Sequence, residues 1–71
     1  MSRMTTHAER VAIAEARVAE ARRIVERQRK IVEAHRRRLT NAVDAEALLG
    51  TFERSLRLFE DELTARRNEK K

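Results

Sequence analysis

The densest group of chemically active side chains lies between residues 22 and 38. Eight arginines and lysines stand there against two acids, Glu26 and Glu33, and the whole chain has a formal net charge of +5. Cationic side chains bind phosphate oxygens, so this segment is a candidate nucleic-acid site. No aromatic side chain lies within it to stack on bases. Among the cations left after the ion pairing inferred below, the candidates for phosphate contacts are Arg23, Arg27, Lys30 and Arg37.

Other residues with chemical potential form no recognisable constellation. His7 and His35 would lie about 42 Å apart along one helix, too far to share a metal ion, and the chain has no cysteine. Ser55 has no histidine or carboxylate at a nucleophile spacing, and the single glycine, Gly50, excludes a glycine-rich phosphate loop. We therefore expect no enzymatic activity, no metal and no cofactor.

The element that positions all these side chains is a long heptad helix. Five heptads run without interruption through residues 8–42. Their a positions are Val11, Val18, Val25, Val32 and Leu39. An apolar repeat of seven residues keeps one stripe of a helix facing a neighbouring helix. The sequence therefore predicts helix-on-helix packing.

Composition supports an all-α class. The chain has 71 residues, no proline, one glycine and 41% charged residues, a combination typical of long helices and coiled coils. So short a chain rarely folds stably without added stabilisation from disulfides, a metal or oligomerisation. Because the chain has no cysteine, oligomerisation is the expected source. No apolar run is long enough for a membrane span or a signal peptide. We expect a cytoplasmic protein that does not contact membranes.

Capping signals predict two helices within one helical-hairpin domain over residues 1–71. Thr6 and Glu9 have the spacing of a capping box, which predicts a first helix over about residues 7–39. Thr40 and Asn41 are poor helix formers, and Asp44 is a good N-cap. These residues predict a turn over about residues 40–44 and a second helix over about residues 45–67.

The apolar stripes of the two helices do not share one phase, which favours an antiparallel hairpin over one continuous rod. Folding about Ala42 would place Val25 against Phe59, Val32 against Phe52, Leu39 against Ala45 and Ala21 against Leu63. The predicted hairpin core comprises Val25, Val32, Leu39, Leu49, Phe52, Leu56, Phe59 and Leu63. Gln28 and His35 occupy polar d positions, which typically set register or oligomeric state. One long parallel coiled coil is the alternative architecture.

The flanks of the predicted seam differ in character. At the e positions, Arg22, Arg29 and Arg36 come opposite Glu60, Glu53 and Glu46, and these three opposite-charge pairs support the antiparallel orientation. The g positions are mostly apolar, and the first helix is expected to overhang the second at its N-terminus. Both surfaces would be covered in a homodimeric four-helix bundle. The predicted oligomer interface is Val11, Ala14, Val18, Ala21, Ile24, Ile31 and Leu48.

The runs AEARRIVERQRKIVEA and DAEALLGTFERSLRLFEDEL resemble a group of short, uncharacterised helical-hairpin proteins of alphaproteobacteria. The residues that carry the resemblance are Arg23, Ile24, Gln28, Ile31 and Val32, then Leu48, Leu49, Phe52, Glu53 and Leu56. Such proteins often turn through a glycine near the aspartate, whereas residues 40–44 contain none. The resemblance implies a bacterial cytoplasmic hairpin and carries over no activity or binding residue.

Together these patterns predict a non-enzymatic interaction or structural module that self-associates and can bind another protein. The alternative function is a basic bundle that binds nucleic acid non-specifically. The two differ in the expected salt dependence of duplex binding.

Overall fold

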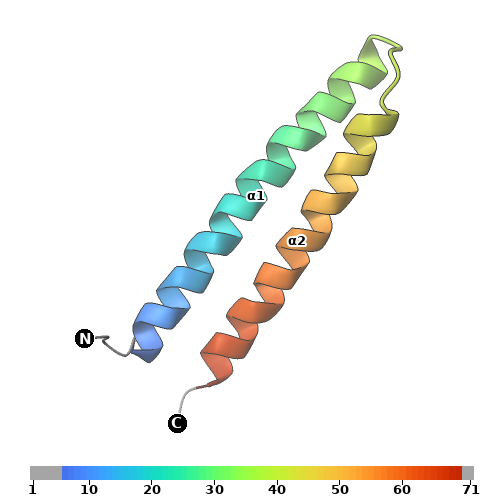
Figure 1. The fold of residues 1–71 in the computed structure, drawn as a ribbon. Coiled ribbons are helices and arrows are strands. Elements are labelled where there is room, and N and C mark those ends of the chain that lie inside the picture. The colour runs from blue at the N-terminus through green and yellow to red at the C-terminus, as the bar shows by residue number, and fades with distance from the viewer. Residues whose placement is uncertain (1–5, 70–71) are drawn as a thin grey trace, which may run out of the picture.

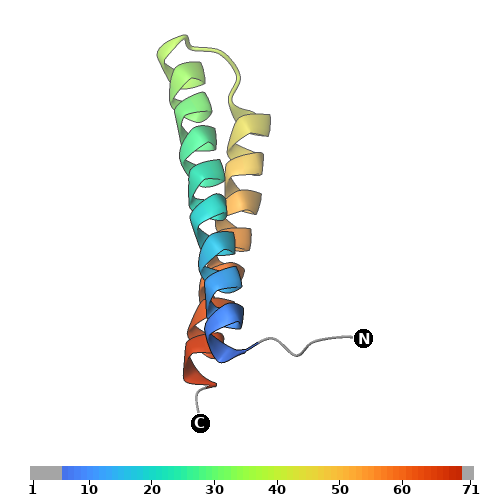
Figure 2. The same ribbon diagram turned by 90° about the vertical axis from the view of Figure 1, so that its left-hand side faces the viewer.

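The protein is an antiparallel pair of helices joined by a short turn. The structure, a computed structural model, describes residues 6–69, which form α1 (His7–Arg37) and α2 (Val43–Asn68). The helices lie side by side along their length, with the start of α1 and the end of α2 at the same end of the molecule (Figure 1). The view turned by 90° shows the same hairpin, with the turn at one end and the start of α1 and the end of α2 at the other (Figure 2). The continuous-rod alternative is therefore excluded.

The start of α1 follows the sequence prediction in detail. The Thr6 side chain accepts a hydrogen bond from the Glu9 backbone N–H at 3.0 Å, and the Glu9 carboxylate accepts one from the Thr6 N–H at 2.8 Å. These reciprocal bonds satisfy two of the N–H groups that a helix start leaves unpaired. The predicted capping box is confirmed.

The turn differs from the prediction. The helix α1 ends at Arg37, two residues early, and α2 begins at Val43 instead of residue 45. Asp44 lies in the first turn of α2 and is not its N-cap, so that prediction is wrong. The N-cap is Ala42, and the Asn41 side-chain oxygen accepts the Val43 N–H at 2.8 Å. Asn41 thus satisfies the first N–H group of α2, although no side chain caps the helix from the N-cap position itself.

Leu39 was predicted in the core, and the structure shows it 93% exposed. The N–H groups of Leu39 and Thr40 bond back to the carbonyls of Arg36 and His35, which is the Schellman pattern that closes a helix. This pattern requires a left-handed residue just after the helix cap, and Leu39 has φ 57°. The side chain therefore points away from the seam.

The register of the seam is displaced by one heptad from the prediction. Leu63 forms a buried cluster with Ala14 and Val18, and Phe59 packs against this cluster. The predicted layers that paired Ala21 with Leu63 and Val25 with Phe59 are therefore wrong. Ala45 also lies beside Gln28, whose side-chain amide donates to its carbonyl oxygen at 2.9 Å, and not beside Leu39.

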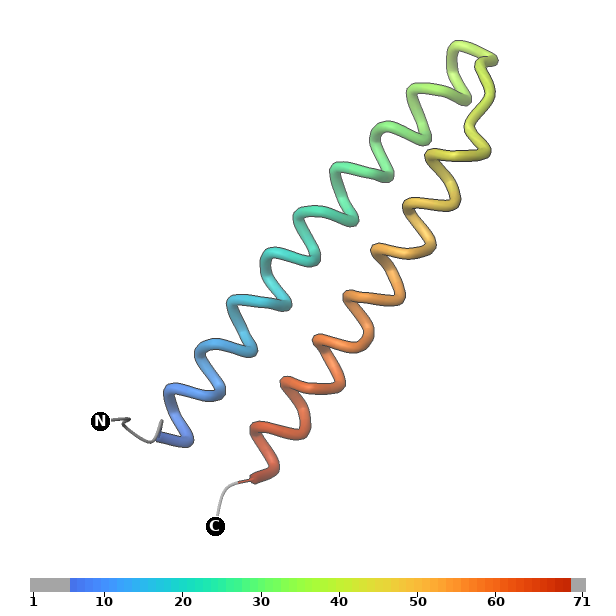
Figure 3. The backbone as a smooth tube through the Cα atoms, viewed as in Figure 1, coloured from blue at the N-terminus to red at the C-terminus, as the bar shows by residue number. Residues whose placement is uncertain are grey.

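The physical reason for the displacement is the length of chain spent in the turn. Because Leu39 leaves the helix and residues 38–42 form the connection, the last turn of α1 extends beyond the first turn of α2 (Figure 3). The overhang expected at the N-terminus of α1 thus lies at the turn. At the open end, Leu63 of α2 covers Ala14 and Val18.

The core along this seam is narrow. Among residues 6–69 the buried apolar residues are Ala14, Val18, Ala21, Val25, Val32, Ala45 and Leu63, joined by Gln28. The other predicted core residues of α2 are only half-buried, namely Leu49, Phe52, Leu56 and Phe59. Small side chains fill the centre of the seam, while larger ones remain partly in contact with solvent.

The backbone of Leu39 gives a direct test of the turn. A residue with a Cβ pays about 1–2 kcal/mol in the left-handed region, which glycine does not. We expect Leu39→Gly to stabilise the protein by about 1 kcal/mol in urea unfolding at a fixed protein concentration. Leu39→Ala retains the Cβ, and we expect it to change the free energy of unfolding by less than about 0.5 kcal/mol. An equal gain in both variants would refute a conformational origin.

Candidate interaction surface

The hairpin has two broad faces, one on each side of the seam. The first, here called the salt-bridged face, carries the e positions of both helices. Its members are Glu15, Arg22, Arg29 and Arg36 of α1 and Glu46, Glu53, Glu60 and Arg67 of α2. The second, here called the open face, carries the g positions, Arg10, Arg17, Ile24, Ile31 and Arg38 with Leu48, Ser55, Glu62 and Glu69.

All three predicted ion pairs form across the salt-bridged face. The nitrogen-to-oxygen distances are 3.5 Å for Arg22 with Glu60, 3.6 Å for Arg29 with Glu53 and 2.9 Å for Arg36 with Glu46. These side chains are largely exposed, so each pair contributes about 0.2–1 kcal/mol at most. These pairs favour the antiparallel orientation of the two helices and cover this side of the seam with polar groups.

A fourth pair on the same face was missed by the sequence analysis. Glu15 meets Arg67 at 3.1 Å, with the signs of charge exchanged between the helices. The e-position rule that gives the other three pairs also gives this one when it is extended by one heptad. It was overlooked because the start of the first helix was expected to overhang the second helix.

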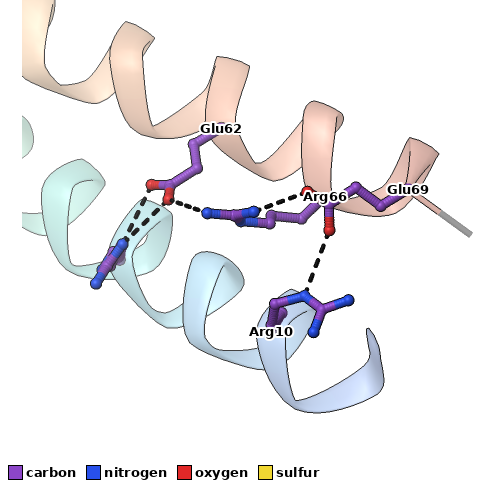
Figure 4. Close-up of polar contacts among 5 residues, drawn as sticks. Arg10, Glu62, Arg66 and Glu69 are labelled. Atoms are coloured by element: carbon purple, nitrogen blue, oxygen red, sulfur yellow. Dashed lines mark hydrogen bonds and ion pairs between the residues drawn. The ribbon is translucent and has the colours of Figure 1, made fainter. Parts of the chain in front are cut away.

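The open face is charged in the half near the termini. Glu69 contacts Arg10 at 3.3 Å and Arg66 at 2.7 Å, while Glu62 contacts Arg66 at 3.5 Å and Arg17 at 3.2 Å. The five side chains form a chain of alternating charges across both helices, drawn in Figure 4. This network joins the first turns of α1 to the last turns of α2.

The same open face is mostly apolar from its middle toward the turn, where the only charged g position is Arg38, beside the turn itself. A groove of about 370 Å³ lies between the helices. Its lining is Arg17, Glu20, Ala21, Ile24, Phe52, Ser55 and Phe59. The next g positions toward the turn are Ile31 and Leu48, which are 41% and 49% exposed. Among residues 6–69 no ion pair crosses the seam in this half of the face.

The predicted oligomer interface divides accordingly. Ala14, Val18 and Ala21 are buried within the hairpin itself, so their prediction as intermolecular contacts is wrong. The reason is again the displaced register, which brings α2 over residues expected to overhang. Val11 is half-buried and packs on the Leu63 cluster. Ile24, Ile31 and Leu48 remain accessible on the open face.

The candidate phosphate-binding cations also divide. Arg23 is held by Glu20 at 2.7 Å. Arg27, Lys30 and Arg37 are exposed on the outer side of α1, and within the described part of the chain none of them forms an ion pair. Three of the four predicted cations are thus available to an external anion.

The polar d positions lie in different surroundings. Gln28 is buried and bonded to Ala45, as described above. His35 is half-buried, and its Nδ1 lies 2.7 Å from the hydroxyl oxygen of Thr40 in the turn. Within residues 6–69 no three histidines, cysteines or acids are grouped to hold a metal ion. Neither α1 nor α2 is long and apolar enough to cross a bilayer.

Comparison with known proteins adds no further assignment. No family model, curated protein or solved structure matches the sequence significantly. The resemblance to alphaproteobacterial hairpin proteins therefore stays a prediction, and the surface is interpreted from its own chemistry.

The ion-pair network near the termini affects the pKa of Glu69 and so the pH dependence of stability. The hydrogen bond from Arg66 is the main cause that lowers the pKa of Glu69, and the charges of Arg66 and Arg10 lower it further. A carboxylate whose pKa is lowered on folding stabilises the protein above its ordinary pKa of about 4.3. That contribution is lost as the pH falls through the lowered pKa.

We expect a carboxyl NMR titration to give Glu69 a pKa below that of an ordinary glutamate. Arg66→Gln should return this pKa most of the way to the ordinary value, because it removes both the hydrogen bond and the nearest charge. Arg10→Gln is the matched control and should return it less. An equal response to the two substitutions would contradict the assigned order of causes.

Proposed function

We propose that the protein is a non-enzymatic interaction or structural module that self-associates into a homodimeric four-helix bundle. In this bundle the open faces of two hairpins are in contact. The observation that carries the proposal is the difference between the two broad faces. One is closed along its length by four ion pairs, while the other exposes Ile31 and Leu48 beside an apolar groove.

The narrow core supports this proposal. A hairpin that buries mainly alanine and valine leaves the groove-lining Phe52 and Phe59 partly in water. Covering them would remove further apolar area from solvent, at about 25 cal/mol per Å². Chains this short generally need such a supplement to the core of a single domain.

The dimensions of the hairpin also support a second copy as the occupant. The molecule measures 54 × 24 × 15 Å, so its broad face exceeds the roughly 800 Å² per partner that a standard stable interface buries. A second copy offers a face of the same length with the same apolar half. A different protein with an apolar helical face would fit the groove too, and the measurement below distinguishes that case.

We expect the chain to sediment as a dimer, and Ile31→Glu or Leu48→Glu to shift it toward monomer. Each substitution would place a carboxylate in a desolvated interface, and two-fold symmetry makes it occur twice. We expect the dissociation constant to rise at least about tenfold, which corresponds to about 1.4 kcal/mol. Analytical ultracentrifugation over a concentration series measures this constant.

The matched control is Val43→Glu. Val43 is 64% exposed and lies at the start of α2, away from the g positions, where an acid is favourable for the helix. It should leave dimerisation unchanged. A monomeric parent chain would refute self-association and leave a different protein as the partner of the groove.

A second candidate function rests on a separate observation, the three exposed cations on the outer side of α1 that have no ion-pair partner among residues 6–69. Arg27, Lys30 and Arg37 could contact backbone phosphates whether or not the open face is covered. Such contacts read charge and not sequence, so this candidate is a non-specific nucleic-acid binder.

For this second candidate we expect duplex affinity to fall about 40-fold between 50 and 200 mM salt, from three phosphate contacts per protein chain. Fluorescence anisotropy of a labelled duplex measures the change. Arg27→Gln combined with Arg37→Gln should reduce both affinity and salt dependence. The matched pair Arg54→Gln with Arg57→Gln removes the same charge from α2 and should have a smaller effect. Absence of binding at 50 mM salt would refute this function.

A further inference from the structure

The open face has a direction, because its g positions change in character from the termini to the turn. Arg10 faces Glu69 and Arg17 faces Glu62, both as ion pairs. Ile24 and Ser55 come next and line one groove, followed by Ile31 and Leu48. From the termini to the turn, the g positions of α1 thus carry two arginines and two isoleucines before Arg38 at the turn, while those of α2 carry two acids and then Ser55 and Leu48.

Two symmetric arrangements can bring two such faces together. If the two-fold axis runs along the helices, α1 of one copy lies on α2 of the other and both turns are at the same end. If the axis runs across the helices, α1 lies on the partner's α1 and the turns are at opposite ends. Both arrangements give closed four-helix bundles with antiparallel neighbours.

The first arrangement matches the chemistry of three levels of the open face, namely the two charged levels and the level of Ile31 with Leu48. Arg10 and Arg17 of one copy then lie at the height of the partner's acidic g positions, and Ile31 lies at the height of the partner's Leu48. These are the pairings already made within each hairpin, repeated between copies. Opposite charges meet near the termini, and apolar side chains meet near the turn.

The second arrangement mismatches the same residues. With the two α1 helices crossing at their middle, Arg17 falls near the partner's Ile31 and Arg10 near the partner's Arg38. A staggered version that superposes the apolar halves brings Arg17 toward the partner's Arg38, again a pair of like charges. Like-charge contacts and buried unpaired charges select strongly against an interface geometry.

From this pattern we infer that two copies dock with their open faces in the same direction, α1 on the partner's α2, with both turns at one end of the bundle. The inference rests on the proposed self-association. It adds the orientation of the partner and assigns Arg10, Arg17, Glu62 and Glu69 as the residues that determine it.

Because the chain has no cysteine, single spin labels can measure this orientation in the full-length protein. Leu39→Cys places a label on the exposed turn. In the inferred dimer the two labels should lie less than about 30 Å apart, since packed helices are 8–10 Å from axis to axis. Turns at opposite ends would separate them by more than about 35 Å, because α1 is 31 residues long.

The control label is Arg57→Cys, which is exposed near the middle of the hairpin and should give a similar distance in both arrangements. A short Leu39→Cys distance supports the inference. A long one, with dipolar coupling at position 57, overturns the inferred direction while leaving self-association intact. Absence of coupling from both labels overturns the proposed dimer and the inference with it.

Discussion

The structure depends on the a/d seam, and a heptad seam can close only in registers that differ by seven residues. Sliding α2 by one heptad along α1 exchanges one set of small and apolar side chains for a nearly equivalent set. The observed seam places Leu63 against Ala14 and Val18, whereas a shift of one heptad would place it against Ala21. The seam alone hardly discriminates between these registers. The turn decides between them, because it fixes how many residues are spent before α2 begins.

This degeneracy explains which features could be predicted from sequence. The helices, their antiparallel orientation, the capping box of Thr6 with Glu9 and three ion pairs all follow from local rules. The ion pairs survive the change of register because arginines of α1 lean away from the turn and glutamates of α2 lean toward it. Long side chains therefore meet across an offset between Cα atoms that is compatible with either register. The three ion pairs could be predicted correctly even though the predicted register was wrong.

The turn itself could not be predicted, because a leucine adopts the left-handed conformation there. Helix ends that use a left-handed residue usually place glycine or asparagine there, and Leu39 is the last apolar a position of the heptad repeat. A continuing repeat naturally indicates a continuing helix. Only the tertiary structure shows that the backbone bonds of Leu39 and Thr40 to Arg36 and His35 prevail over burial of one leucine.

The two broad faces differ in how they cover the small core between the helices. On the salt-bridged face, the ion pairs shield the seam with side chains that remain hydrated, so nothing on this face favours further burial. On the open face, the ion pairs lie in the terminal half, where Glu62 and Glu69 each contact two arginines. Near the turn the same g positions hold Ile24, Ile31 and Leu48, which cannot shield the seam by hydration. The charged part of this face needs opposite charges from a partner, and the apolar part needs apolar side chains. Any partner of this surface is therefore constrained in direction as well as in composition.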